Sequence, residues 1–115
     1  MPDCVLVRVG ERRVAVPTAR VREVSAVVAV TPVPSAPAPV VGLTQLRGQI
    51  LPVLDLHPGA PRTPRPNDPL IIVELGPVRA ALLVDHVLGV ESDPPAAEVL
   101  DVGALFDQVR ALVQP

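Results

Sequence analysis

The sequence of 115 residues contains no Lys, no Trp and no Tyr, and it has a single Cys and a single Phe. One cysteine cannot form an internal disulfide, which favours a reducing compartment. Without Trp or Tyr, the chain lacks the aromatic platforms on which single-stranded nucleic acids stack. The formal net charge of −2 provides no attraction toward phosphate backbones. We therefore expect no nucleic-acid partner.

Long hydrophobic runs and ligand motifs are also missing. No apolar stretch approaches the roughly 20 residues that span a bilayer, and the first residues alternate between charged and apolar types, unlike a secretion signal. Two histidines without paired Cys/His spacing do not predict a metal site, and the glycines form no phosphate-binding loop. These absences predict a cytoplasmic protein with no direct membrane insertion, no metal and no cofactor.

Valine is the commonest residue, and apolar residues make up 49% of the chain. Its β-branched side chain suits the pleated, half-buried surface of a sheet. The length predicts one domain over residues 1–115. Short apolar stretches between Gly and Pro turns favour a mostly β fold of small barrels or a sandwich. Strands are expected over residues 4–9, 13–16, 21–30, 40–46, 49–56, 70–75, 78–84 and 85–90.

Residues 40–56 are the most informative stretch: an apolar strand, an Arg47-Gly48 turn and a second apolar strand. The turn places one arginine at the tip of a hairpin. From position alone, a surface ion pair and a contact with a partner are both open for Arg47, and an ion pair with a nearby arginine is equally open for Glu23. Pro52 predicts an edge strand or a bulge, because proline cannot donate to a sheet ladder.

The last segment changes to a helical period. Asp101 is suited to an N-cap, and we expect a helix over residues 102–113. Its apolar stripe is expected to pack into the core rather than to serve a partner. The stripe consists of Val102, Leu105, Phe106, Val109, Leu112 and Val113.

Catalysis has little support in the sequence. An acid–base pair could be assembled from Asp55 and His57, or from Asp85 and His86. No Ser or Cys nucleophile stands in a recognisable motif beside them. Asp55 is more simply interpreted as bonding backbone near the end of its strand, and Asp85 as beginning a turn. We expect no enzyme, with a small hydrolase based on Asp55 and His57 as a competing interpretation.

Five segments, taken in order, resemble the signature of CheW-like domains. The central one, Gly42–Leu56, is similar to the family pattern G-x-x-N-L-R-G followed by x-[IV]-x-P-[IV]-x-D-L. The other four are Ala15-Val16-Pro17, Val21-Arg22-Glu23-Val24, Thr31–Pro37 and Val84–Val90, the last similar to V-D-x-V-x-x-V.

This resemblance implies a fold and a role. The fold is two small SH3-like β-barrels packed together, and the role is that of a non-enzymatic adaptor between chemoreceptors and a histidine kinase. Apolar barrel surfaces would meet the regulatory domain of a CheA-like kinase, while a groove near Arg47 would hold the cytoplasmic tip of a receptor. Carried over by motif, the partner-binding residues are Val21, Glu23, Gly42 and Arg47.

Two departures from the family pattern carry expectations of their own. Gln45 stands where the family has Asn, so the bonding between side chain and backbone at this turn is expected to differ from the family's. The family also has another strand pair between the segment equivalent to 84–90 and the last strand, so the second barrel is expected to be incomplete. Unpaired strand edges invite another chain, including a second copy. The alternative function is therefore a divergent CheW-like protein that self-associates or scaffolds another signalling protein and has lost receptor–kinase coupling.

Overall fold

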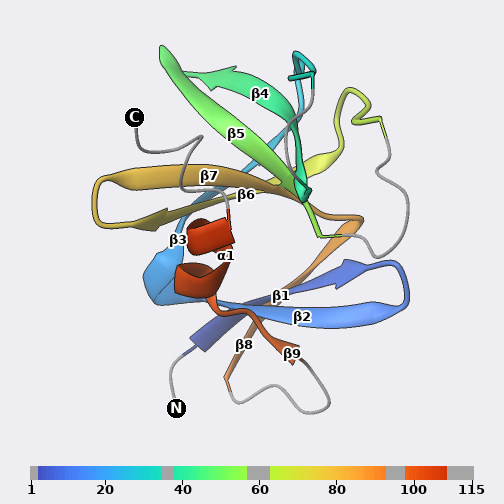
Figure 1. Ribbon diagram of the computed structural model, residues 1–115. Coiled ribbons are helices and arrows are strands. Elements are labelled where there is room, and N and C mark those ends of the chain that lie inside the picture. The colour runs from blue at the N-terminus through green and yellow to red at the C-terminus, as the bar shows by residue number, and fades with distance from the viewer. Residues whose placement is uncertain (1–2, 35–37, 57–62, 93–97, 109–115) are drawn as a thin grey trace.

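The computed structural model describes residues 3–34, 38–56, 63–92 and 98–108. Strands dominate, as expected, and most expected strands are confirmed (Figure 1). The long extended stretch from Val21 ends as a strand at Ala26. The elements are β1 (Asp3–Val9), β2 (Arg12–Pro17), the 3₁₀ turn η1 (Thr18–Arg20), β3 (Val21–Ala26), β4 (Val40–Leu46), β5 (Gln49–Asp55), β6 (Pro69–Leu75), β7 (Val78–Leu83), β8 (His86–Ser92), β9 (Glu98–Val99) and α1 (Val102–Gln108).

The strands form two sheets. One has four strands in the order β8-β1-β2-β9 and is built from the two ends of the described chain. The other has five strands in the order β3-β6-β7-β5-β4. Antiparallel hairpins supply most of the pairing, and the β5–β7 and β2–β9 pairs are parallel.

The segment that follows β3 closes the five-stranded sheet. Thr31 and Leu43 exchange two backbone hydrogen bonds of 2.8 Å each, and the Thr44 hydroxyl donates to the Ala29 carbonyl at 2.8 Å. These bonds join the segment that follows β3, the first strand in the sheet order, to β4, the last strand. A barrel-like sheet results, and the β4–β5 hairpin projects from it (Figure 1).

Closure requires a glycine on β4. A Cβ atom on Gly42 would lie 2.5 Å from the Thr31 carbonyl oxygen and 2.6 Å from Val30 Cγ1. Both distances are shorter than any real Cβ contact. The glycine of the signature motif thus allows two backbone segments to approach closely.

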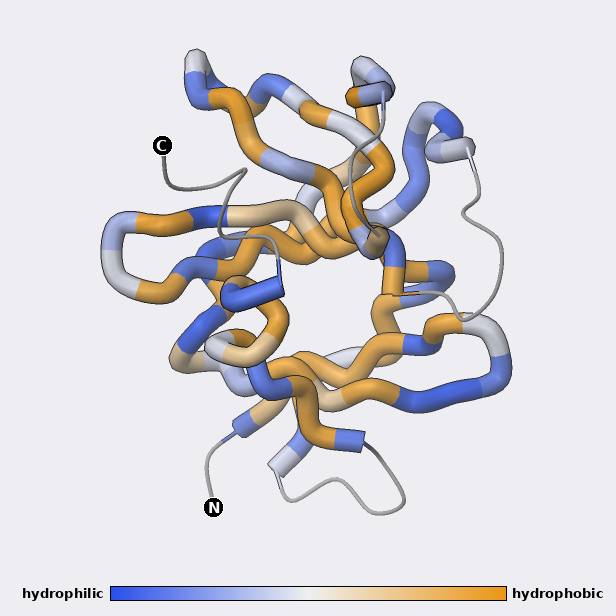
Figure 2. The backbone as a smooth tube through the Cα atoms, viewed as in Figure 1, coloured by the Kyte–Doolittle hydropathy of each residue, from blue (hydrophilic) through white to orange (hydrophobic). Residues whose placement is uncertain are grey.

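The main core lies between the two sheets. Side chains from both sheets meet there, and Figure 2 shows the apolar segments gathered around the middle of the molecule. With one Phe and no larger ring, the core is filled mainly by valine and leucine, as the composition implies. Its buried members are Val5, Val7, Val9, Val14, Val16, Val40, Leu54, Ile71, Val73, Ala80, Leu82, Val84, Val102, Leu105 and Phe106.

The helix α1 enters this core. Asp101 caps it, because its Oδ1 accepts a hydrogen bond of 3.0 Å from the Ala104 backbone N–H. Val102, Leu105 and Phe106 are buried in the core cluster, which confirms the expected packing. The predicted helix is confirmed as far as Gln108, and residues 109–113 lie outside the described ranges.

Pro52 does not lie on an edge strand, so the edge alternative was wrong. The bulge alternative is nearer the structure, because the β4–β5 register shifts between Val40 and Gly42, beside the Leu43–Pro52 pair. β5 has β4 on one side and β7 on the other. Leu43 lies opposite Pro52 in the β4–β5 ladder, and its backbone N–H and C=O are both hydrogen-bonded to Thr31. Leu43 and Pro52 therefore exchange no hydrogen bonds. The pairing with β7 begins only at Val53. The proline therefore stands where neither neighbour needs an N–H donor.

The four-stranded sheet remains open in the described part of the chain. β8 forms one edge and the two-residue β9 forms the other. Arg12 on β2 holds β9 through two contacts to the Glu98 carboxylate, of 2.9 and 3.0 Å. This open sheet agrees with the expected incomplete second barrel. No helix in the described ranges combines the length and apolar composition needed to cross a bilayer.

Candidate functional site

The β4–β5 hairpin ends in a two-residue turn with positive φ angles, 50° at Arg47 and 80° at Gly48. Leu46 pairs with Gln49 across it. Two successive positive φ values define a type I′ turn, whose twist matches that of the strands it joins. The predicted Arg-Gly tip is therefore confirmed. Because the turn is tight, the direction in which the Arg47 side chain leaves the backbone is well determined.

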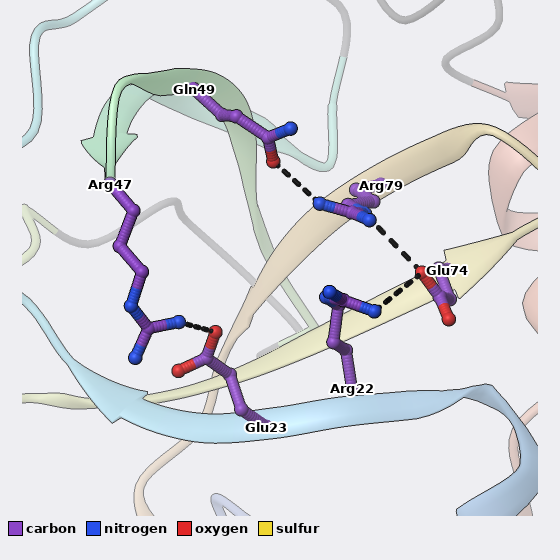
Figure 3. Close-up of polar contacts among 6 residues, drawn as sticks. All are labelled: Arg22, Glu23, Arg47, Gln49, Glu74 and Arg79. Atoms are coloured by element: carbon purple, nitrogen blue, oxygen red, sulfur yellow. Dashed lines mark hydrogen bonds and ion pairs between the residues drawn. The ribbon is translucent and has the colours of Figure 1, made fainter.

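Arg47 forms an ion pair with Glu23, which lies on β3 (Figure 3). The Arg47 side chain is 73% exposed, whereas that of Glu23 is 22% exposed. The hydrogen bond from Arg47 Nη1 to Glu23 Oε1, together with the negative charge of Glu23, raises the pKa of the arginine. The guanidinium thus lies on the surface and is oriented by a carboxylate from β3, a strand outside the β4–β5 hairpin.

A second contact holds the same hairpin. The Arg79 guanidinium on β7 donates to the Gln49 side chain at 2.7 Å and to Glu74 on β6 at 3.3 Å. Arg22 on β3 approaches the same Glu74 oxygen at 3.8 Å. Figure 3 shows the resulting polar chain across β3, β6, β7 and the start of β5. The hairpin tip is therefore tied to the sheet at two points, Arg47 and Gln49.

These residues surround a concave surface beneath the hairpin, here called the hairpin groove. It consists of two adjoining hollows of about 190 and 590 Å³ that share Gln49, Leu51 and Arg79. The side chain of Ile50 is 69% exposed at this groove. The exposed lining of both hollows is more polar than apolar, with Leu51 and Ile72 buried beneath it, and such a surface is suited to polar contacts with another protein. Its lining is Arg22, Glu23, Leu46, Arg47, Gln49, Ile50, Leu51, Pro52, Ile72, Pro77, Val78 and Arg79.

The four residues predicted to bind partners fall into two groups. Glu23 and Arg47 meet in the ion pair at the rim of the groove. Val21 is half-buried and packs against the main core, while Gly42 lies where β4 meets Thr31. The structure thus provides a packing reason for Val21 and Gly42, and the partner-binding role of all four residues stays a prediction.

Sequence reasoning did not predict the second half of the polar chain. Glu74 and Arg79 are opposite each other in the β6–β7 hairpin, and cross-strand pairing could have suggested their contact. Nothing local indicates that this hairpin lies beside Gln49, because that contact depends on the order of strands in the sheet.

Asp55 and Asp85, two of the residues considered for catalysis, make other contacts in the structure. Asp55 is buried at the end of β5, where its backbone N–H donates to Pro39 at 2.9 Å, and His57 lies outside the described residues. Asp85 accepts a hydrogen bond from the Gly10 N–H, which fixes the turn between β7 and β8 against the β1–β2 hairpin. Among the described residues, no three His, Cys, Asp or Glu side chains are grouped as a metal site.

Comparisons with known proteins agree on one family. The family model described as the CheW-like domain matches residues 3–97. The chain is 38% identical over 93 residues to the protein FrzA of Myxococcus xanthus, covering 77% of this chain and 58% of FrzA.

Among solved structures, the chain is similar to the scaffolding protein TtCheW from Thermoanaerobacter tengcongensis. The TM-score is 0.68 and the identity 31%, over 83% of this chain and 64% of TtCheW. The chain thus spans about three fifths of the length of these two relatives. The match bears out the expected mostly β, CheW-like fold of SH3-like barrels, and it follows that the chain belongs to the CheW-like domain family.

Proposed function

We propose that this chain is a non-enzymatic coupling adaptor that joins a chemoreceptor to a histidine kinase of the chemotaxis type. The observation that carries the proposal is the Arg47–Glu23 pair on a rigid turn at the rim of the hairpin groove. Membership of the CheW-like family and similarity to a scaffolding protein support it. The cytoplasm, where such receptors present their kinase-binding tips, is the proposed location.

The exposed guanidinium supplies the recognition chemistry. Arginine presents five N–H donors in a planar fork, and one nitrogen of Arg47 contacts Glu23. The Arg47 side chain is 73% exposed, so its remaining donors are accessible to a partner. A receptor tip with carboxylate or carbonyl acceptors would find a donor already oriented, which lowers the entropy cost of binding.

The mechanism is scaffolding. Receptor and kinase would contact different surfaces of one chain, and signalling would depend on the geometry in which they are held. The receptor tip would occupy the hairpin groove, and the kinase regulatory domain would meet apolar barrel surface. No reaction takes place in the chain itself.

Reversing the charge of Arg47 tests the receptor contact. Arg47→Glu is expected to weaken binding to the cytoplasmic tip of the cognate receptor at least tenfold, because an interface arginine is a frequent hot spot and the new carboxylate would repel Glu23. Isothermal titration calorimetry with a purified receptor fragment measures the affinity. Binding of the cognate kinase regulatory domain is expected to change less than threefold.

Two further variants make the result specific. Arg13→Glu introduces the same charge change at an exposed position of β2, in the other sheet, and is expected to leave the receptor affinity unchanged. The double variant Glu23→Arg, Arg47→Glu restores the ion pair with its charges exchanged. If that variant binds the receptor fully, the pair is only structural and Arg47 makes no contact. An equal loss of receptor affinity in the Arg13→Glu variant would likewise contradict the proposal.

The alternative is a divergent family member that self-associates, or scaffolds another signalling protein, without coupling receptor to kinase. The open four-stranded sheet favours it. A folded wild-type chain that binds neither the cognate receptor tip nor the kinase domain would decide for this alternative.

A further inference from the structure

The outer edge of β8 faces no other strand in the described part of the chain. β8 pairs with β1 on one side only. Its exposed apolar side chains are Val87, Leu88 and Val90, the last 65% exposed. Edge strands are usually protected by Lys or Pro, and β8 contains neither. Its protective features are the charged side chain of Glu91 and the bulge described next.

A β-bulge in β8 places Val87 and Val90 on the same face of the sheet. Leu6 pairs with Gly89, whereas Val7 pairs with Val87, so Leu88 is the extra residue. In a regular strand, residues 87 and 90 would point to opposite faces. With the bulge, Val87 is opposite Val7 and Val90 is opposite Val5. Val5 and Val7 both belong to the main core, so both β8 valines extend its face.

The flanking residues share the other face. His86 pairs with Arg8, and Glu91 pairs with Cys4. Arg8 and Cys4 alternate with the core-facing valines of β1, so His86 and Glu91 both point away from the main core.

We propose that the edge of β8 pairs with the β8 edge of a second copy of this chain, antiparallel, about a twofold axis between Leu88 and Gly89. In this register His86 lies opposite Glu91 of the second copy, and Val87 lies opposite Val90 of the second copy. Each contact occurs twice, because the axis repeats it. The two four-stranded sheets become one continuous sheet.

The bulge selects this register. Residues opposite each other in an antiparallel pair point to the same face. An axis through Gly89 would place Val87, on the core face, opposite Glu91, on the other face. Only the axis between Leu88 and Gly89 keeps both flanking pairs on matching faces.

Chemical complementarity identifies a second copy as the occupant. The register places valine against valine and an imidazole against a carboxylate, and both kinds of cross-strand pair are favourable. An imidazole N–H can donate to the Glu91 carboxylate whether or not the ring is charged. The paired segment, His86–Glu91, is about 20 Å long, so the interface falls below the roughly 1,200 Å² of stable complexes. The dimer is therefore weak, with dissociation at micromolar to millimolar concentration.

Charge reversal tests both the dimer and its register. Sedimentation of the full chain from about 5 µM to about 1 mM is expected to show a rising apparent mass. Interference optics are needed, because the chain has no Trp or Tyr. His86→Glu places two carboxylates opposite each other twice per dimer, whereas Glu91→Arg replaces the carboxylate with a guanidinium that cannot accept the His86 N–H. Each variant is expected to weaken association about tenfold. Both residues are exposed, so the variants are expected to fold, which circular dichroism verifies.

Combining the two charge changes within one dimer distinguishes this register from other registers. The double variant His86→Glu, Glu91→Arg is expected to dimerise like the wild type. An equimolar mixture of the two single variants is expected to form a mixed dimer, since every opposing pair is then complementary. The control Val99→Lys changes the opposite edge of the sheet and is expected to have no effect.

Three results would overturn the proposal: a constant monomer mass up to about 1 mM, loss of association in Val99→Lys with none in the β8 variants, or failure of the mixed variants to recombine. Capture of a receptor or kinase by this edge, abolished by His86→Glu, would also overturn it. Receptor binding by a strictly monomeric chain would leave the proposed function intact, so the two can fail separately.

Discussion

Replacing Gly42 with alanine is expected to lower the free energy of unfolding by about 2–3 kcal/mol. The added Cβ would lie 2.5 Å from the carbonyl oxygen of Thr31. That oxygen accepts the Leu43 N–H at 2.8 Å, so it cannot retreat without breaking the bond that closes the five-stranded sheet. Urea unfolding followed by far-ultraviolet circular dichroism measures the change.

The matched control is Gly103→Ala in α1. The new Cβ would lie 3.4 Å from Asp101 Oδ1 and 3.9 Å from Leu75 Cδ2, which are ordinary contacts. Alanine also has the higher helix propensity, so this variant is expected to gain about 0.5–1 kcal/mol. If the Gly42→Ala variant unfolds at the same urea concentration as the wild type, this result would contradict the close approach between β4 and Thr31.

This prediction bears on the proposed interface. Gly42 carries no side chain for a partner to recognise, and it does not line the hairpin groove. If Gly42→Ala reduces receptor binding, we expect the cause to be displacement of the β4–β5 hairpin and, with it, of Arg47. Comparing the loss of affinity with the loss of stability distinguishes this indirect effect from a direct contact.

Truncating the single aromatic side chain is expected to have the largest effect. Phe106→Ala should cost about 3–5 kcal/mol, from lost burial and from the cavity left behind. Phe106 is 5% exposed and belongs to the core cluster that contains side chains of both sheets. The other buried members of this cluster are aliphatic side chains, all smaller than phenylalanine. For a chain of 115 residues, this is a large fraction of the total stability.

Thermal unfolding by circular dichroism checks this expectation. A loss of that size corresponds to a fall in Tm of about 4 °C for each kcal/mol. Phe106→Leu, which keeps most of the volume, is expected to cost less than about 2 kcal/mol. Gln108→Ala, on the exposed side of the same helix, is expected to change stability by less than about 0.5 kcal/mol. A Phe106→Ala protein that melts like the wild type would show that α1 does not hold the core together.

The local parts of the fold could be predicted from the sequence, because local residues determine them. The Arg47-Gly48 tip follows from the demand of a type I′ turn for positive φ, and the cap at Asp101 from side-chain chemistry. The error at Pro52 had a different origin. A proline is excluded only where its missing N–H is needed, and that depends on which neighbouring residues pair with it.

The candidate site could be predicted only in part, because tertiary contacts assemble it. Sequence motifs identified Glu23 and Arg47 separately, and either of two arginines could have paired with Glu23. Strand order decides the choice: β3 lies against β6, and Arg22 is directed to Glu74 while Glu23 reaches the hairpin tip. The contact from Arg79 to Gln49 joins residues 30 positions apart and has no local signal.

The division of the strands between the two sheets has a consequence for synthesis on the ribosome. The five-stranded sheet uses one continuous stretch, from β3 to β7, and can form as soon as that stretch emerges. The β1–β2 hairpin leaves the ribosome before the five-stranded sheet, yet the strand that covers its side, β8, is translated only after β7. The β1–β2 hairpin is therefore made before the five-stranded sheet but completed after it, and until then the nascent hairpin is exposed to chaperones and neighbouring chains.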